Sequence, residues 1–175
     1  PAKIVAKMNS LCDEGIIAAL YEASAAGVEI ELIVRGICCL KVGIPGISEN
    51  IHVRSIVGNF LEHSRIFFFL NDGEEELYMG SADWMPRNLD RRVEILFPVL
   101  DDTLKEKVKH ILDVELADNT KAHVLKPDGE YEKIDRRGKV LVNSQKQFCE
   151  EAVAAVPKTD HVYRERVFVP AEPAE

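Results

Sequence analysis

The fold of this chain is decided by residues 3–36, which read KIVAKMNSLCDEGIIAALYEASAAGVEIELIVRG. The pattern predicts an opening strand, a helix capped by Asp13 and ended by Gly27, and a second strand over 28–34 that becomes wholly apolar. A strand–helix–strand crossover is right-handed and leaves its two strands parallel, so this unit predicts an α/β domain. Arg35 follows the second strand directly, at the edge where open α/β sheets bind ligands.

The rest of the chain predicts a mixed sheet with helices packed on it. We expect strands over 51–56, 66–70, 77–80 and 92–99, helices over 101–116 and 144–156, and a small hairpin over 121–134. Asn71-Asp72-Gly73 is a hairpin signal between two of these strands. Residues 57–62 are expected to form one helical turn, and Leu104 is expected to face the core.

Composition and charge narrow the class of protein. A net charge of −8 with a pI near 5.2 disfavours binding to nucleic acid. No apolar run is long enough to cross a bilayer, so a soluble protein is expected. Four cysteines without a CxxC pair predict buried free thiols in a reducing cytoplasm rather than a metal site. A chain that begins at Pro1 instead of Met is interpreted as a fragment of a longer protein.

Positive charge is concentrated in one part of the sequence. Between positions 35 and 92 there are six of the ten arginines and a single lysine. Arginine grips phosphate oxygens in pairs, which lysine cannot do, so the cluster favours a phosphate-binding site. Ordinary ion pairs on the surface are the alternative explanation.

His63 and Arg65 form the second informative pattern. They precede a predicted strand, two positions apart, so their side chains could share one face, and the hairpin should bring Gly80 and Ser81 back beside them. An imidazole that moves protons near neutral pH, next to a guanidinium, suits phosphoryl transfer. The alternatives are structural: a histidine at a cap or in the core, Ser81 capping a turn, and Asp83 paired with Arg87.

The spacing of these residues is similar to a motif of a known protein family. His-x-Arg, with Gly-Ser-x-Asp fifteen residues after the arginine, resembles the His-x-Lys and Gly-Ser-x-Asn half-motif of the phospholipase D superfamily, with departures at Arg65 and Asp83. Longer strings in the same order resemble the C-terminal domain of bacterial polyphosphate kinases. They are Ile4-Val5-Ala6-Lys7-Met8-Asn9-Ser10-Leu11, Val34-Arg35-Gly36-Ile37-Cys38-Cys39-Leu40, Ser48-Glu49-Asn50-Ile51, Leu61-Glu62-His63-Ser64-Arg65 and Ser81-Ala82-Asp83-Trp84-Met85-Pro86-Arg87-Asn88-Leu89.

The resemblance implies an α/β, phospholipase-D-like domain over residues 1–156, with a mixed sheet and flanking helices, followed by a flexible tail over 157–175. It implies that His63 is a general acid or base that contacts ATP, while the phosphate-carrying histidine belongs to a preceding domain. We predict His63 as the catalytic residue. Residues predicted to bind ATP or phosphate are Arg35, His63, Arg65 and Arg92, with Glu94, Ser81 and Asp83 in support.

The implied substrates are ATP or ADP and inorganic polyphosphate, with Mg²⁺ held by the preceding domain and no metal ligand in this chain. Expected partners are the upstream domains of the same protein and further copies of it, but not nucleic acid. The expected location is cytoplasmic, with membrane association of the full-length protein left open.

Two other functions stay open on the sequence. A phosphodiester hydrolase would need a second His-x-Lys or His-x-Arg motif. The one other instance is His52-Val53-Arg54, and no Gly-Ser follows it at the motif's spacing. A non-catalytic module that binds polyanions or forms dimers would explain the arginines but does not require His63.

Overall fold

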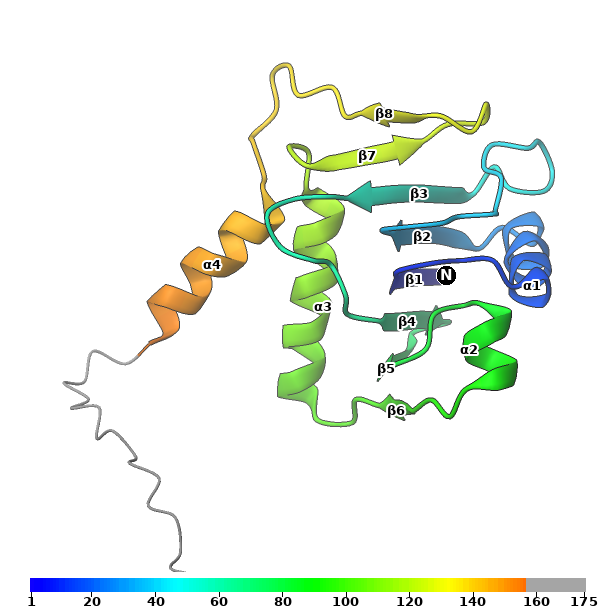
Figure 1. Cartoon of the computed structure of the whole chain (residues 1–175), viewed down its shortest axis with the longest axis horizontal. Coiled ribbons are helices and arrows are strands. Elements are labelled where there is room, and N and C mark those ends of the chain that lie inside the picture. The colour runs from blue at the N-terminus through cyan, green and yellow to red at the C-terminus, as the bar shows by residue number, and fades with distance from the viewer. Residues whose placement is uncertain (157–175) are drawn as a thin grey trace, which may run out of the picture.

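A computed structural model of the chain describes residues 1–156 (Figure 1). The tail predicted over 157–175 lies outside the described residues. In chain order the elements are β1 (Ala2–Met8), α1 (Glu14–Ala25), β2 (Glu29–Val34), β3 (Ile51–Ile56), β4 (Ile66–Asn71), β5 (Glu74–Gly80), α2 (Pro86–Arg91), β6 (Leu96–Pro98), α3 (Asp102–Ala117), β7 (Ala122–Leu125), β8 (Tyr131–Lys133) and α4 (Ser144–Ala155).

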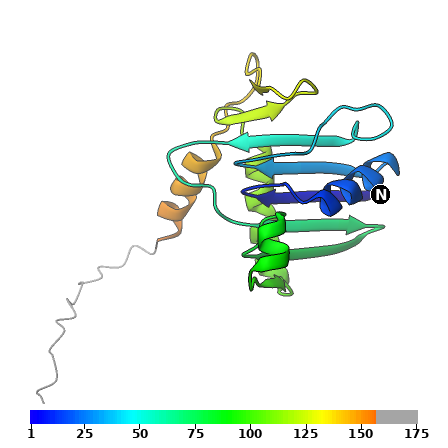
Figure 2. The ribbon, with the colours of Figure 1, turned by 45° about the vertical axis from the view of Figure 1, so that its right-hand side comes forward.

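The strands of residues 1–156 form one mixed sheet in the order β6-β5-β4-β1-β2-β3-β7-β8. β1 pairs in parallel with β2, from Lys3 opposite Glu29 to Met8 opposite Val34, and β2 pairs in parallel with β3. Every other neighbouring pair is antiparallel. The parallel crossover predicted from residues 3–36 is therefore confirmed, and Figure 2 shows β1, β2 and β3 running toward the same edge.

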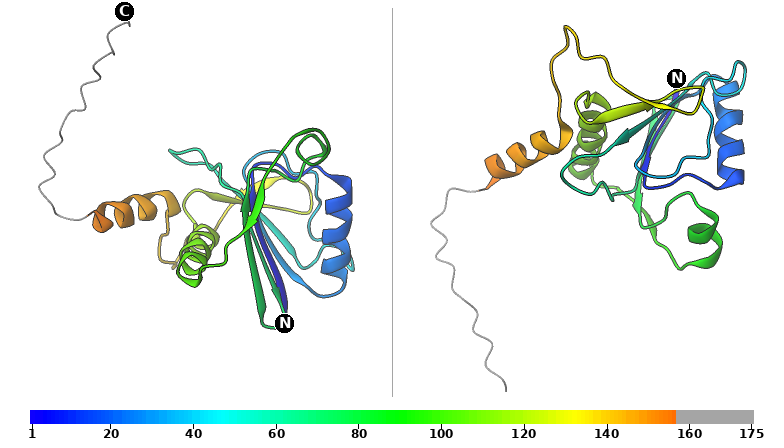
Figure 3. Two further views of the ribbon diagram at one scale, coloured as in Figure 1. Left: turned by 90° about the horizontal axis from the view of Figure 1, so that it is seen from below. Right: turned by 45° about the horizontal axis from the view of Figure 1, so that its top comes forward.

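Helices cover both faces of this sheet. Seen along the sheet in the left view of Figure 3, α1 lies on one side, and α3 and α4 lie on the other. Successive side chains of β1 point to opposite faces of the sheet, so the strand contributes to two hydrophobic clusters. Ala6 and Met8 belong to the cluster under α1, and Val5 belongs to the cluster under α3. A sheet that is buried on both faces explains why residues 4–6 of β1 and 32–34 of β2 are wholly apolar.

Caps and turns form where the local sequence predicts them. The Asp13 carboxylate accepts a hydrogen bond of 2.9 Å from the Ile16 amide at the start of α1, and Asp101 does the same for Leu104 at the start of α3. At the β4–β5 turn, Asp72 and Gly73 both have positive φ angles, 49° and 91°. This left-handed pair is the hairpin geometry that an Asp-Gly sequence favours.

Two expected elements are wrong. Residues 57–62 form an irregular connection rather than a helical turn, because the backbone of Phe60 bonds to the side chain of Gln145 instead of to its own neighbours. The strand expected over 92–99 shrinks to β6 because the 92–95 segment folds back onto Ser81. The helix α2 was not expected, although Pro86 occupies its first turn, where proline is favoured.

Some expectations about burial are also wrong. Leu104 is 52% exposed, because the first turn of α3 lies beside the short edge strand β6, while Val108 and Leu112 are buried as predicted. Cys39 and Cys149 are exposed rather than buried. Cys39 lies in a loop, and Cys149 lies on α4, which projects away from the sheet (Figure 1). No helix among residues 1–156 is long and apolar enough to span a membrane.

Candidate functional site

Several strand ends meet at one edge of the sheet. β1 and β2 end there, the antiparallel strand β4 begins there, and β5 returns to it. These ends carry Asn9, Arg35, Arg65 and Ser81, so the topology alone gathers polar side chains from four separate parts of the sequence. Gly80 donates a backbone hydrogen bond of 3.3 Å to the Arg65 carbonyl, as expected from the hairpin.

Asp83 is the centre of this polar cluster. Its carboxylate accepts hydrogen bonds from Nε of Arg65 at 3.1 Å and Nη2 of Arg65 at 3.4 Å, and from the backbone and side-chain amides of Asn9 at 2.8 and 3.1 Å. Only 7% of Asp83 is exposed. The two positions that depart from the phospholipase D half-motif, Arg65 and Asp83, therefore form an ion pair with each other. The alternative pairing of Asp83 with Arg87 does not occur.

Arg35 joins the cluster through Asn9 and keeps most of its guanidinium open. Its Nε donates to the Asn9 side-chain oxygen at 3.3 Å. The terminal nitrogens of Arg35 have no hydrogen-bond partner among residues 1–156, and the side chain is half-buried at the end of β2. An arginine held at Nε presents its terminal N–H groups as a fork, the geometry that matches phosphate oxygens.

His63 lies in the irregular connection between β3 and β4 and is exposed. Its imidazole makes no hydrogen bond within the described part of the chain, whereas its backbone oxygen accepts one from Nη1 of Arg65 at 2.9 Å. The Arg65 side chain turns inward to Asp83. Arg65 links the His63 backbone to the buried carboxylate.

A second polar group lies beside the first. The Glu94 carboxylate accepts hydrogen bonds from the Ser81 hydroxyl and, at 2.7 Å, from the Asn88 amide. These two hydrogen bonds, with the positive charges of Arg92 and Arg65, hold the pKa of Glu94 below its ordinary value. Arg92 is half-exposed and lies 4.0 Å from Glu94, a loose ion pair that leaves its guanidinium accessible.

Glu94 and Arg92 also line an aromatic hollow of about 360 Å³ between the β4–β5 hairpin and α2. Its walls include Phe67, Tyr78 and Trp84, with Trp84 stacked on Phe67 at 5.1 Å between ring centres. Trp84 therefore packs against the core on the α1 side of the sheet. Arg35 and His63 do not line this hollow.

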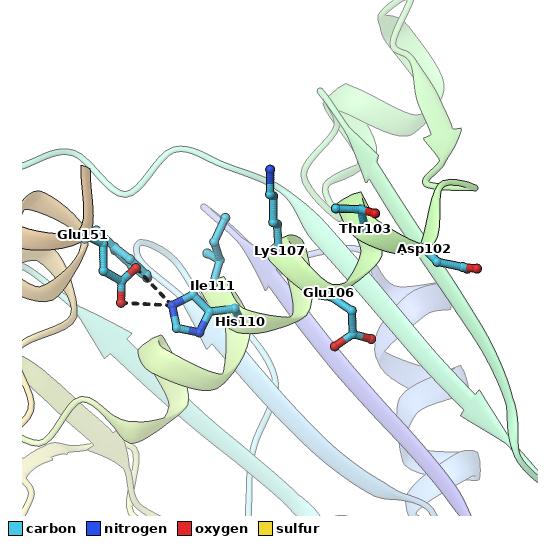
Figure 4. Close-up of a pocket in the computed structure, with 8 residues that line it drawn as sticks. Asp102, Thr103, Glu106, Lys107, His110, Ile111 and Glu151 are labelled. Atoms are coloured by element: carbon cyan, nitrogen blue, oxygen red, sulfur yellow. Dashed lines mark hydrogen bonds and ion pairs between the residues drawn. The ribbon is translucent and has the colours of Figure 1, made fainter. Parts of the chain in front are cut away.

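A larger hollow of about 770 Å³ lies between α3 and α4 (Figure 4). His110 and Glu151 approach across it, with Nε2 of the imidazole 3.0 Å from the carboxylate. This hollow is open and none of the predicted site residues line it. The polar edge around Asp83 remains the candidate functional site.

Two residues of the site, Asn9 and Asn88, were not predicted from the sequence, and one arginine of the cluster, Arg54, does not reach the site. Asn9 and Asn88 hold Asp83 and Glu94, and a polar residue directly after the strand β1 was the signal that could have identified Asn9. Arg54 belongs to the same stretch of arginines but pairs with Glu31 at 3.7 Å and with the Leu116 carbonyl. Ion pairing thus explains part of the arginine cluster.

Glu62, the residue before His63, belongs to a group of three ionisable side chains with Lys7 and Glu115. Nζ of Lys7 is 3.1 Å from Glu62 and 3.7 Å from Glu115, and the side chains of Lys7 and Glu115 are each 2% exposed. Burial, which outweighs the attraction of Lys7, raises the pKa of Glu115 to about 8. The pKa of Glu62 is lowered. Burial alone would raise it, but this effect is outweighed by hydrogen bonds from Gln145 and Glu115 and by the positive charge of Lys7, which together stabilise the ionised carboxylate. Lys7 and Glu62 therefore form the ion pair, and Glu115 is largely protonated near neutral pH.

The Glu115→Gln variant should gain stability relative to the wild type as pH rises. Folded Glu115 keeps a proton that the unfolded chain releases near its ordinary pKa of 4.5, so its contribution to stability is lost as pH rises from 4.5 to 8. Glutamine mimics the protonated form. Between pH 6 and pH 8, urea unfolding should show the variant gaining roughly 2 kcal/mol on the wild type. A constant difference would mean that folded Glu115 is already ionised at pH 6. Glu49→Gln, which alters an exposed carboxylate, is the matched control.

Comparison with known proteins gives one consistent result. The family model described as "Polyphosphate kinase C-terminal domain 2" matches residues 1–145. The chain is 56% identical over 157 residues to a polyphosphate kinase of Pseudomonas aeruginosa, covering 89% of this chain and 23% of that protein. It is 53% identical over 161 residues to one of Lactiplantibacillus plantarum, covering 92% and 22%. The chain thus spans less than a quarter of these relatives.

Solved structures agree. The crystal structure of polyphosphate kinase from Porphyromonas gingivalis matches with a TM-score of 0.84 and 43% identity, over 87% of this chain and 24% of that one. NucT from Helicobacter pylori matches with a TM-score of 0.51 and 15% identity, over 65% and 78%, a likeness of fold alone. The predicted fold class, an α/β domain with a mixed sheet and flanking helices, is confirmed, and its fold is similar to that of NucT.

Proposed function

This chain belongs to the polyphosphate kinase family, as its C-terminal domain 2, and we propose that it carries one half of the active site of such an enzyme. The proposed reaction is the reversible transfer of the ATP γ-phosphate to a growing polyphosphate chain. A histidine in a preceding domain takes up the phosphoryl group as ADP leaves, and a terminal oxygen of polyphosphate then displaces the histidine from the phosphorus.

The observation that carries the proposal is the Arg35–Asn9–Asp83–Arg65 cluster at the carboxyl edge of the sheet. It holds Arg35 by Nε and leaves its terminal nitrogens open. Phosphoryl transfer relies on positioned positive charge, because negative charge spreads over the oxygens of the group in transit. Arg35 and Arg92 are the proposed phosphate contacts. The N–H groups of Arg65 that make no hydrogen bond within residues 1–156 can also contact phosphate.

His63 is the proposed proton carrier. It stands exposed beside this edge, with its backbone tied to Arg65 and its imidazole unpaired within residues 1–156. In the proposed role it gives a proton to the leaving oxygen, or takes one from the attacking oxygen. Glu94 and Ser81 support the site by keeping the segment that holds Arg92 against the end of β5.

The residues that the structure describes do not fit the Mg²⁺ ion that the family resemblance implies. Magnesium needs oxygen ligands that are free to coordinate it. Asp83 and Glu94 already accept hydrogen bonds from arginine, asparagine or serine side chains, and no group of three or more His, Cys, Asp or Glu residues in the described chain is arranged to hold a metal. Mg²⁺ therefore remains a proposal for residues outside this chain.

The proposed partners are ATP or ADP, inorganic polyphosphate, the preceding domain and further copies of the same protein, in the cytoplasm and without nucleic acid. Exposed apolar side chains support a covering domain. Phe60 and Leu61, three and two positions before His63, are 60% and 67% exposed, and Val93 and Ile95 near Arg92 are also exposed. Apolar groups gathered beside a polar site are typical of a surface that another part of the protein covers.

The test compares residues 1–175 with the full-length protein in polyphosphate synthesis from γ-labelled ATP. The full-length protein should make labelled polyphosphate, and the isolated chain should make none, because it carries half of the proposed site. Robust synthesis by the isolated chain, with contaminating kinase excluded, would contradict the two-domain site. Cleavage of a phosphodiester by either protein would favour the hydrolase. Polyphosphate binding by the full-length protein without synthesis would favour the non-catalytic module.

A further inference from the structure

The segment that carries His63 has no regular structure of its own. It connects β3 to β4 and passes beside the start of α4 (Figure 1). A connection with exposed apolar side chains and no ladder of backbone hydrogen bonds is ordinarily mobile. The proposed role of His63 requires the opposite, because a proton carrier must be held close to its productive position. The segment that carries His63 must therefore be held in place by residues from another part of the chain.

Gln145, in the first turn of α4, makes the contacts that fix it. Its Oε1 accepts a hydrogen bond of 3.0 Å from the Phe60 amide, and its Nε2 donates to the Phe60 carbonyl at 2.8 Å. The same Nε2 donates to the Glu62 carboxylate at 2.6 Å. The Gln145 side chain thus satisfies both backbone groups of Phe60, as a neighbouring strand would, from 85 positions away in the sequence.

Gly58 shows how closely the amide is seated. A Cβ atom at position 58 would lie 2.3 Å from Oε1 of Gln145, far inside van der Waals contact. Glycine is therefore needed here for the close approach of the amide to the chain. The clash would fall on the end of a flexible side chain, so an alanine at this position would push the amide away rather than unfold the segment.

The start of α4 is itself rigidly held. The Asp118 carboxylate accepts hydrogen bonds from the Ser144 amide at 2.8 Å and the Ser144 hydroxyl at 2.7 Å, and both residues are completely buried. The same carboxylate also caps the turn after α3 through the amides of Thr120 and Lys121. Gln145 follows Ser144 directly, so its amide extends from an anchored position.

Glu62 completes the arrangement from the other side. Gln145 holds one of its oxygens and Lys7 of β1 holds the other at 3.1 Å. The residue before His63 is therefore tied to α4 and to the central strand of the sheet, while Arg65 ties the His63 carbonyl to Asp83. The backbone is held on both sides of an imidazole that stays free.

We propose that Gln145 is a positioning residue for His63, and that its side-chain amide orders residues 58–62 so that the imidazole reaches the transferring phosphate. The proposal rests on the proposed function only for its catalytic consequence. The ordering of the segment stands on the contacts alone.

The test uses the full-length protein with Gln145→Ala. Turnover should fall by about 10- to 100-fold, as expected for a displaced proton carrier, while the KM for ATP changes by less than about threefold. Amide hydrogen exchange over residues 59–63 should speed up by about tenfold or more. Gln147→Ala is the matched control. Gln147 lies on the same helix and donates to Glu151 at 2.8 Å, so its loss should change neither measurement.

Gly58→Ala provides an independent variant that leaves α4 untouched. It should reproduce both effects, because the new methyl group displaces the Gln145 amide. In the Gln145→Ala background the same methyl group has room, so the double variant should be no worse than Gln145→Ala alone. A general loss of stability would instead make the two effects multiply. Unfolding midpoints of all variants are measured on the same preparations.

Three results would overturn the proposal: unchanged exchange over 59–63 in both single variants, faster exchange with undiminished turnover, or multiplied losses in the double variant. A wild-type protein that makes no polyphosphate is a different outcome. It would contradict the proposed function, and hydrogen exchange alone would then decide whether Gln145 orders the segment.

Discussion

Replacing His63 by glutamine should lower polyphosphate turnover by about 10²–10⁴-fold, the usual scale of general acid–base catalysis. Glutamine keeps a hydrogen-bonding side chain of similar reach but cannot carry a proton near neutral pH. Stability should hardly change, because the His63 side chain is exposed and makes no hydrogen bond among residues 1–156. Turnover of the full-length protein and thermal unfolding would be measured on the same preparations.

His52 supplies the matched control for this variant. It is also exposed and is also followed two positions later by an arginine, but it lies within β3 and away from the Asp83 cluster. His52→Gln should therefore leave turnover unchanged. A fully active and normally stable His63→Gln protein would remove His63 from the mechanism. A His63→Gln protein whose activity falls only as far as its unfolding midpoint would indicate a structural histidine.

Arg35→Ala should lower kcat/KM for ATP by roughly 10- to 150-fold, corresponding to about 1.5–3 kcal/mol for a lost charge-assisted phosphate contact. The structure supports this size of effect, because the terminal nitrogens of Arg35 have no partner within the described residues and would be free to bind phosphate. The Asn9–Asp83 contacts should survive, so folding should change little.

Arg35→Lys should recover only part of the loss, because lysine keeps the charge and loses the fork. Arg87→Ala is the control, since Arg87 is an exposed arginine on α2 that makes no ion pair within residues 1–156. Kinetics of all three variants of the full-length protein over a range of ATP concentrations would decide the matter. Full activity of Arg35→Lys would show that charge alone suffices at this position.

Much of the fold could be predicted because its signals are local. The Asp13 cap, the Asp72-Gly73 turn and the apolar run of β2 each depend on residues within a few positions of one another. The helical turn expected over residues 57–62 failed because its outcome depended on a partner far away in the chain. Residues 57–62 are not helical because Gln145 takes the backbone groups of Phe60.

The candidate site shows the same division. Motif spacing led to His63, Arg65, Ser81 and Asp83, but which of these would touch could not be worked out from spacing. From its position in the motif, Arg65 was predicted to bind phosphate. In the structure its guanidinium donates hydrogen bonds to the Asp83 carboxylate and to the His63 carbonyl. Asn9 was missed as a partner of Asp83 because the two residues lie 74 positions apart, and the family string that contains Asn9 does not say what it contacts.

By itself, the sequence determined the α/β class, the parallel opening unit, the hairpin and the identity of the residues with the right chemistry. All of these follow from periodicity, turn preferences and side-chain type, which are properties of neighbouring residues. The tertiary structure alone decided that Asn9, Arg65 and Asp83 form one buried network and that Gln145 holds the segment before His63. Such contacts depend on the register and order of the strands, which the whole chain settles together when it buries both faces of the sheet.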